Sequence, residues 1–327
     1  MNSQLLTILS SLRLPGVSVA FAFSLSSLLF ACGDDDDAGQ GGGPSDATDS
    51  PDADVASDAQ GSDIAGTLDS GVSTMPPMCS GDQLFGRPNE TTGLTGEQCT
   101  AFCADCGPQG FEAREFSEAE IEQLRAWRLS EPFDEITDDP YLDDAPSSTP
   151  ESVCGFLADP EEPLTYRLQT FGSTEEAVAA GAEVTHGGVC GVCSTLENLA
   201  VYIQNEDLTA PVRQCGLDGI SGGKDSNIAC LQELGFDLPC AQIWYFNTEN
   251  TRNSCFEPCI AALNEPYHLP DGSLNECLQC DEDNSGPVFK AVAGRTRRNS
   301  GLANALCRPC SEVMPLQHTY ANLTSAP

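Results

Sequence analysis

Apolar positions in the second half of the chain recur at helical spacing and predict several helices. In the first of them the apolar positions fall between 196 and 203, behind a cap at Ser194. A second helix is expected to begin at Ser226 and end at Gly235, and Pro239 fits the first turn of a third. This part of the chain is therefore predicted to be predominantly α-helical.

One segment ahead of these helices alternates between apolar and polar residues in the manner of a strand. This strand is predicted at residues 164–171, and a helix capped by Ser173 and an extended piece at 183–186 follow it. Their order predicts a short βαβ-like unit near residues 164–186. The fold class expected from the whole pattern is α+β.

The chain from residue 79 onward is predicted to contain a small subdomain at 79–163 and a main helical domain at 164–327. In the first of these, Thr95 opens a short helix that carries three cysteines, and a capping box predicts another helix at 117–128. The acidic, proline-rich stretch 131–163 is predicted to be a loop.

Two segments before residue 79 differ from the rest of the chain. The 15-residue apolar run from Val17 to Ala31 is shorter than the roughly 20 residues that a spanning helix needs, so residues 1–31 are predicted to be a signal peptide. Residues 32–78 hold eleven aspartates and no Lys, Arg or Glu. They are predicted to form a disordered tether, because such a segment cannot bury enough apolar surface to order itself.

The end of the apolar run carries a sequence resemblance. Leu29, Phe30, Ala31 and Cys32 resemble the lipobox of bacterial lipoproteins, which implies cleavage before Cys32 and acylation of this cysteine. The acyl chains would anchor the protein in a lipid bilayer of the cell envelope, facing the periplasm or the exterior, with the outer membrane favoured over the inner. An ordinary secretory signal and an uncleaved anchor are the alternatives.

The charge of the chain excludes one class of partner. Fifty Asp and Glu against fourteen Lys and Arg give a net charge of −36 at pH 7. Nucleic-acid binding depends on basic side chains that neutralise phosphates, so no nucleic acid is expected as a partner. An unknown protein or small-molecule ligand remains possible, and no cofactor is expected.

Cysteine is abundant in the part of the chain that follows the tether. Sixteen cysteines remain when Cys32 is set aside, and an even number in an exported chain predicts as many as eight disulfides. The spacing does not reveal which cysteines pair. A disulfide-rich domain that depends on these bonds for its stability is expected.

The segment around Cys190 and Cys193 offers two chemistries. A cysteine at a helix N-terminus has a lowered pKa, and Cys-Gly-Val-Cys between a strand and a helix resembles the thioredoxin-type redox motif. The same residues resemble the papain-type signature, in which Cys193 would be the nucleophile. His186 and the downstream His318 could serve such a site. The alternative is that both cysteines form structural disulfides.

Two further patterns could hold metal ions. Cys277, Cys280, Cys307 and Cys310 have the look of a zinc ribbon, with disulfides as the alternative in an oxidising compartment. Asp281, Asp283 and Ser285 resemble the opening of a calcium loop, although Val292 stands where its bidentate acid would be.

Four cations gather within nine residues of this acidic chain. They are Lys290, Arg295, Arg297 and Arg298, which could bind an anionic ligand or pair with the abundant carboxylates of the chain itself. The first functional hypothesis is an anchored, extracytoplasmic lipoprotein with a disulfide-stapled binding or structural domain. The second is a thiol-dependent enzyme, either an oxidoreductase or a cysteine hydrolase, centred on His186.

Overall fold

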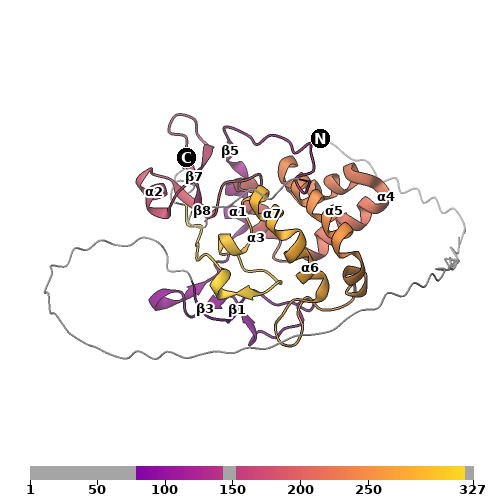
Figure 1. Ribbon diagram of the computed structural model, residues 1–327. Helices are drawn as coiled ribbons and strands as arrows, with labels where there is room; N and C mark the ends of the chain where they lie inside the picture. Colours follow the sequence, from indigo (N-terminus) through magenta and orange to yellow (C-terminus); the bar gives the residue numbers. More distant parts are fainter. Residues whose placement is uncertain (1–78, 143–151, 321–327) are drawn as a thin grey trace, which may run out of the picture. The chain divides into compact units, whose positions relative to one another are not determined.

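The second half of the chain folds mainly into helices, as its apolar pattern predicts. The computed structural model describes residues 79–142 and 152–320 (Figure 1), so the predicted leader, Cys32 and the tether lie outside the described residues. The fold is a disulfide-rich α+β arrangement, which confirms the predicted class. Its helices are α1 (Glu118–Ala126), α2 (Thr174–Ala179), α3 (Leu196–Gln204), α4 (Thr209–Glu233), α5 (Leu238–Ala261), α6 (Glu276–Asn284) and α7 (Gly286–Ala293), with short 3-10 turns η1 (Gly107–Gln109), η2 (Arg298–Ser300) and η3 (Cys310–Glu312).

Two helices begin where the sequence indicates, and a third begins one residue later. Ser117 opens α1 through the predicted capping box. Pro239 lies in the first turn of α5. Its missing N–H costs no hydrogen bond there, because the first N–H groups of a helix have no partner within the helix. The cap of α3 is Thr195 and not Ser194, whose hydroxyl is hydrogen-bonded to His186 instead.

Helix α4 is a hairpin of two arms. Gly223 has a φ of 78°, which glycine adopts without the strain that a side chain would cause. Cys215 and Cys230 are 15 residues apart, yet their Cα atoms lie 5.4 Å apart, whereas a straight helix would separate them by about 22 Å. The helix predicted from Ser226 onward is therefore the second arm, and we call residues 209–222 the first arm.

The main sheet has four strands in the order β5-β7-β6-β8. Strands β7 (Thr165–Phe171) and β8 (Glu183–Gly187) are both antiparallel to β6 (Val153–Ala158), which lies between them. Strand β5 (Arg128–Leu129) pairs with β7 at the edge. Because α2 connects β7 to β8, the predicted βαβ-like unit is present as a split unit, with β6 inserted between its two parallel strands.

Strand β6 corrects the prediction of a loop over residues 131–163. The short run that begins at Val153 forms a central strand, and Phe156 in it is fully buried. A strand covered on both faces shows no alternation of apolar and polar residues, so the pattern used to find strands was missing here. The described residues belong to one compact unit (Asp69–Pro327), and the boundary predicted after residue 163 falls between the hydrogen-bonded neighbours β6 and β7.

Eight disulfides join the sixteen cysteines of the described residues. Cys99–Cys307 and Cys103–Cys310 span 208 and 207 residues and tie the first described segment to the last. They hold this first segment in short strands, so the helix predicted to open at Thr95 is wrong. The strands are β1 (Leu84–Phe85), which pairs with β2 (Cys99–Thr100) and β9 (Arg308–Pro309), and β3 (Phe102–Cys103), which pairs with β4 (Phe111–Glu112).

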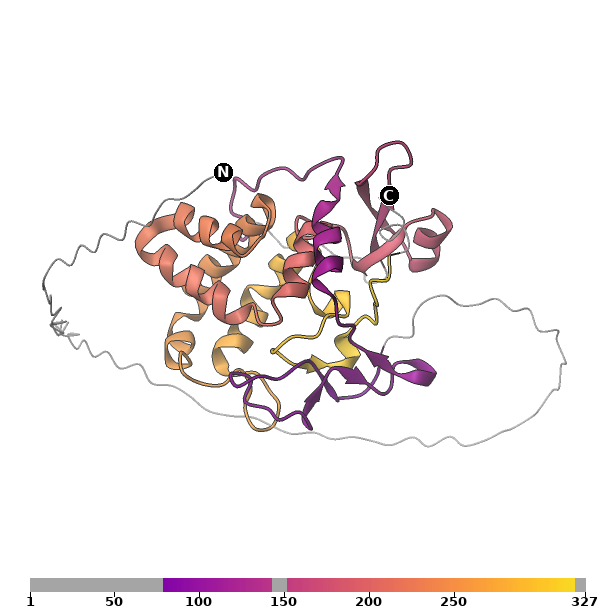
Figure 2. The same cartoon turned by 180° about the vertical axis from the view of Figure 1, so that it is seen from behind.

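An aromatic cluster joins the sheet to the helices. Phe156 makes edge contacts with Tyr166 and Tyr320, with ring centroids 6.1 and 4.8 Å apart, and Trp127 lies 6.5 Å from Phe156. Figures 1 and 2 show α4 and α5 on one side of this part of the fold and the strands with α2 on the other. None of the described helices is long and apolar enough to cross a bilayer.

Candidate functional site

A cavity of about 320 Å³ lies among helices α4, α5, α6 and α7. Its apolar lining includes Val212 from the first arm of α4, Trp244 and Phe256 from α5, and Phe289 from α7. Ligand pockets generally measure about 300–1,000 Å³ and are mostly apolar with a few polar groups. The cavity has the size and the lining expected for a site that holds a small ligand.

Large apolar side chains gather at this cavity although they are exposed to solvent. Leu217 and Ile220 on the first arm of α4 are 44% and 61% exposed, and Phe256, Ile260 and Leu263 near the end of α5 are 42–55% exposed. We call these five residues the apolar rim. They make up half of the ten large apolar side chains that are exposed among the described residues. Such a concentration is typical of interaction sites.

The sequence places the α4 part of the apolar rim on one face of its helix. Residues 212, 213, 216, 217 and 220 line the cavity from the first arm, at the spacing of one helical face. Gly216 allows this arm to approach α5 closely, because a Cβ atom there would lie 2.6 Å from Cγ2 of Thr248. A larger residue at position 216 would push the two helices apart and change the shape of the cavity.

Two polar groups on residues of the cavity wall are buried away from solvent. These are the hydroxyl of Tyr202 and the indole Nε1–H of Trp244, and the Trp244 side chain interacts with the Tyr202 hydroxyl. The Trp244 ring packs against Phe289, with ring centroids 4.6 Å apart. Both polar atoms are inaccessible to solvent, so they belong to the supporting wall and do not face a ligand in the cavity.

The α6 side of the cavity carries an ion cluster centred on Glu282. Its carboxylate accepts from Lys290 at 3.0 Å, from Arg298 at 2.7 Å and from Arg308. Burial raises the pKa of Glu282, but the three cations outweigh this effect and lower the pKa to about 2. Nothing in the sequence marks Glu282 or Arg308, because the cluster joins α6, α7, η2 and β9 only after the chain has folded.

The four cations considered as an anion site are divided between two roles, and two of them follow the alternative of pairing with a carboxylate of the chain. Lys290 and Arg298 pair with Glu282, as described above. Arg297 donates to the backbone carbonyls of Asn205 and Ala303. Arg295 is fully buried and donates to the carbonyl oxygens of residues 185, 193 and 194. Both guanidinium groups therefore hold backbone segments together.

The two histidines considered for catalysis lie in the buried network around Arg295. His186 Nε2 lies 2.6 Å from the Ser194 hydroxyl, and His318 Nε2 lies 2.6 Å from the carbonyl oxygen of Ser300. Burial, and then the charge of Arg295, lower the pKa of both imidazoles, that of His318 to about 3. Both rings are buried, so this network is built to support the fold.

The cysteines considered for catalysis are both bound in disulfides. Cys190 pairs with Cys154 and Cys193 with Cys240, so they are not bonded to each other. Nucleophilic attack and thiol exchange need a thiolate, which a cysteine in a disulfide does not provide. The structure therefore corrects the redox and hydrolase interpretations of this motif in favour of a structural role.

The predicted zinc ribbon is corrected in the same way. All four of its cysteines form disulfides with partners outside the motif, and a disulfide sulfur is not the thiolate that zinc requires. The bonds are Cys277–Cys259, Cys280–Cys255, Cys307–Cys99 and Cys310–Cys103.

The predicted calcium loop is a helix. Asp281 and Asp283 belong to α6, and Ser285 is its C-cap. Asp283 lies two positions from each of the other two residues and therefore points to nearly the opposite side, so the three side chains do not converge on one ion. Asp281 instead accepts hydrogen bonds from Thr251 and, at 3.2 Å, from the Asn247 amide, and burial raises its pKa.

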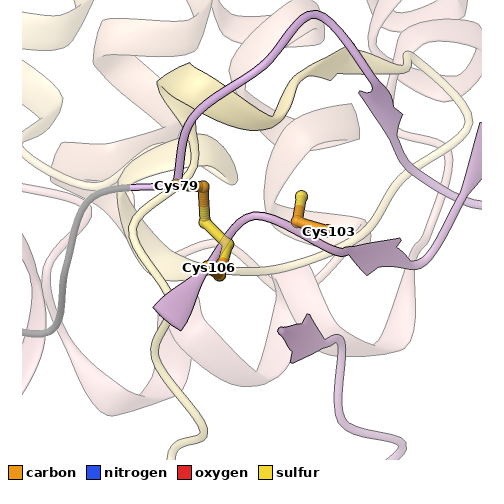
Figure 3. Close-up of side chains that lie close together, drawn as sticks. All are labelled: Cys79, Cys103 and Cys106. Atoms are coloured by element: carbon orange, nitrogen blue, oxygen red, sulfur yellow. A yellow bond between two sulfur atoms is a disulfide. The ribbon is translucent and has the colours of Figure 1, made fainter. Parts of the chain in front are cut away.

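Three sulfur atoms near the start of the described chain lie within 4.8 Å of one another. They belong to Cys79, Cys103 and Cys106 (Figure 3). Cys79 is bonded to Cys106 and Cys103 to Cys310. The cluster therefore consists of two neighbouring disulfides and offers no thiolate to a metal ion.

Part of the chain matches the model of a known family. Residues 224–316 match the model of a family of unknown function (DUF8771). The match covers less than half of the chain and includes α5, α6 and α7 but not the first arm of α4. No curated protein and no solved structure matches the chain.

Proposed function

We propose that this chain is a lipid-anchored protein of the cell envelope whose disulfide-stapled domain binds a small apolar ligand in the cavity among α4, α5, α6 and α7. The apolar rim carries this proposal, because its five exposed side chains would lose their contact with water when a ligand covers them. The thiol-dependent alternative is not proposed, since it needs a free thiolate at Cys190 or Cys193.

Two observations support the cellular location in this proposal. The lipobox-like residues that end at Cys32 precede an acidic segment suited to a flexible tether. Eight disulfides agree with an oxidising compartment outside the cytoplasm, because such bonds are rare where thiols are kept reduced.

Replacement of Cys32 is expected to release the protein from the membrane. The Cys32→Ala variant has no thiol for acylation, so it should lose incorporation of an alkyne-labelled fatty acid and move from the membrane pellet to the soluble fraction. Ser27→Ala, in the same leader, is the matched control and should behave as the wild type. A Cys32→Ala protein that stays wholly in the membrane pellet would refute the lipid anchor.

Binding of a neutral apolar probe tests the cavity itself. N-phenyl-1-naphthylamine should become fluorescent when it binds the mature chain, and it should accept energy from Trp244. The chain has two tryptophans, so the Trp127→Phe variant leaves Trp244 as the only donor. Combined Leu217→Ser and Ile220→Ser substitutions should weaken binding about tenfold, because two half-exposed side chains together contribute about 1.4 kcal/mol.

The matched control for the rim is Val178→Ser. Val178 lies on helix α2 and is 60% exposed, against 61% for Ile220, but it does not line the cavity. This variant should bind the probe as the wild type does. The proposed binding function fails if the wild type does not bind the probe, or if the rim variants and the control bind it equally well.

A further inference from the structure

The lining of the cavity reverses the charge balance of the chain. Six of the fourteen Lys and Arg line it, against only four of the fifty Asp and Glu. One of those four is Asp281, and burial raises its pKa, which disfavours its negative charge. The cavity is therefore a cationic site in a strongly acidic protein, and such a site attracts anions.

Most of these cations already have partners, but one does not. Lys290, Arg298 and Arg308 pair with Glu282, Arg252 pairs with Glu249, and Arg297 is bonded to backbone carbonyls. Arg213 on the first arm of α4 forms no ion pair or hydrogen bond within residues 79–142 and 152–320. It is half-buried in the cavity wall, so its charge is only partly screened by water.

The unpaired guanidinium of Arg213 can only donate hydrogen bonds. A ligand that satisfies this group must offer acceptor oxygens. An ionised carboxylate offers only acceptors, and it pairs with a guanidinium in a bidentate manner.

We propose that the cavity binds a single-chain amphiphile with a carboxylate head, that Arg213 receives this carboxylate, and that the apolar rim covers the alkyl chain. The inference rests on the proposed function and names the class of its ligand. Arg213 lies one helical turn before Leu217 and two turns before Ile220 on the same face. A carboxylate at Arg213 thus places about 10 Å of apolar rim along the α4 side of the alkyl chain.

Competition between matched compounds tests this proposal. Decanoate, 1-decanol and decyltrimethylammonium share one alkyl chain and should be titrated against bound N-phenyl-1-naphthylamine on the mature chain. Decanoate should displace the probe at a concentration about tenfold lower than 1-decanol, because a partly buried charge pair adds to the burial of the chain. The cationic compound should be the weakest, and added salt should shrink the preference for decanoate.

Substitution of Arg213 assigns the preference to this residue. Arg213→Gln should bind the neutral probe normally but lose the preference for decanoate over 1-decanol, whereas Arg213→Lys should keep most of it. Arg128→Gln, on an exposed arginine of β5 outside the cavity, is the control and should behave as the wild type. Equal competition by decanoate and 1-decanol, or a preference that survives Arg213→Gln, overturns the inference and leaves the proposed function standing. Failure of the wild type to bind the neutral probe overturns the proposed function itself.

Discussion

Removal of both long-range disulfides is expected to destabilise the fold by clearly more than the sum of the two single removals. Cys99–Cys307 and Cys103–Cys310 close nearly the same loop, of 208 and 207 residues. Either bond alone keeps the two ends of the described chain together, so one is redundant while the other remains. When both are absent, the unfolded chain regains the entropy of a very long loop.

The size of this effect follows from loop-closure entropy. With the other bond intact, each single removal opens only a short loop and should cost roughly 2.5 kcal/mol, whereas loss of both should cost roughly 8 kcal/mol. The interaction energy of the double-mutant cycle is then about 3 kcal/mol. It can be measured by denaturant unfolding of variants in which both cysteines of a disulfide are replaced by Ala. The loss of packing caused by each Cys→Ala pair cancels in the cycle, so only the interaction between the two disulfides remains.

A different disulfide supplies the control for this cycle. Cys215–Cys230 closes a loop of 15 residues within α4. The losses of unfolding free energy on removal of this bond and of Cys99–Cys307 should add to within about 0.5 kcal/mol. An additive result for both cycles would mean that the unfolded chain gains little freedom when the long loop opens. The entropic account of these two bonds would then be wrong.

Acid is expected to destabilise the protein through the buried histidines near Arg295. The pKa of His318 falls to about 3 in the folded protein, and that of His186 falls well below its usual value, because burial and Arg295 disfavour a second positive charge. In the unfolded chain both should titrate near 6.5. Their contribution to stability is complete above pH 6.5 and is lost as the pH falls from there toward 3.

His318 should contribute a slope of about 1.4 kcal/mol per pH unit in that window, which removes about 2.7 kcal/mol near pH 4.5, and His186 acts in the same direction. Asp237 and Asp281 work in the opposite direction, because burial raises their pKa and their protonation favours the folded state. The contribution of these carboxylates to the pH dependence is the same in the wild type and in a histidine variant, so it cancels when the two are compared. Denaturant unfolding of His318→Gln should show a slope smaller by about 1.4 kcal/mol per pH unit.

An NMR titration provides an independent check on His318. Its ring should stay neutral until the pH approaches 3 or the protein unfolds. A ring that titrates near 6.5 in the folded protein, or a variant with an unchanged slope, would show that acid acts elsewhere.

Local signals in the sequence predict several elements correctly because they act over a few residues. Ser117 opens α1 through a capping box, and Pro239 begins α5. The βαβ-like unit is found from alternation and its helix cap, but its inserted strand is missed because Phe156 and its neighbours are buried on both faces. The segment from Thr95 is misjudged because bonds to the distant end of the chain hold it extended.

The sequence by itself determined the α+β class, the acidic charge and an even set of cysteines suited to disulfides, since composition and local periodicity are properties of the chain before it folds. The tertiary structure alone decided which cysteines pair, because a disulfide needs Cα atoms within about 7 Å of each other. It also decided that Arg295 is buried and that Arg213 lines an apolar cavity. The cavity draws its walls from residues 202 to 308, and no local pattern connects side chains so far apart.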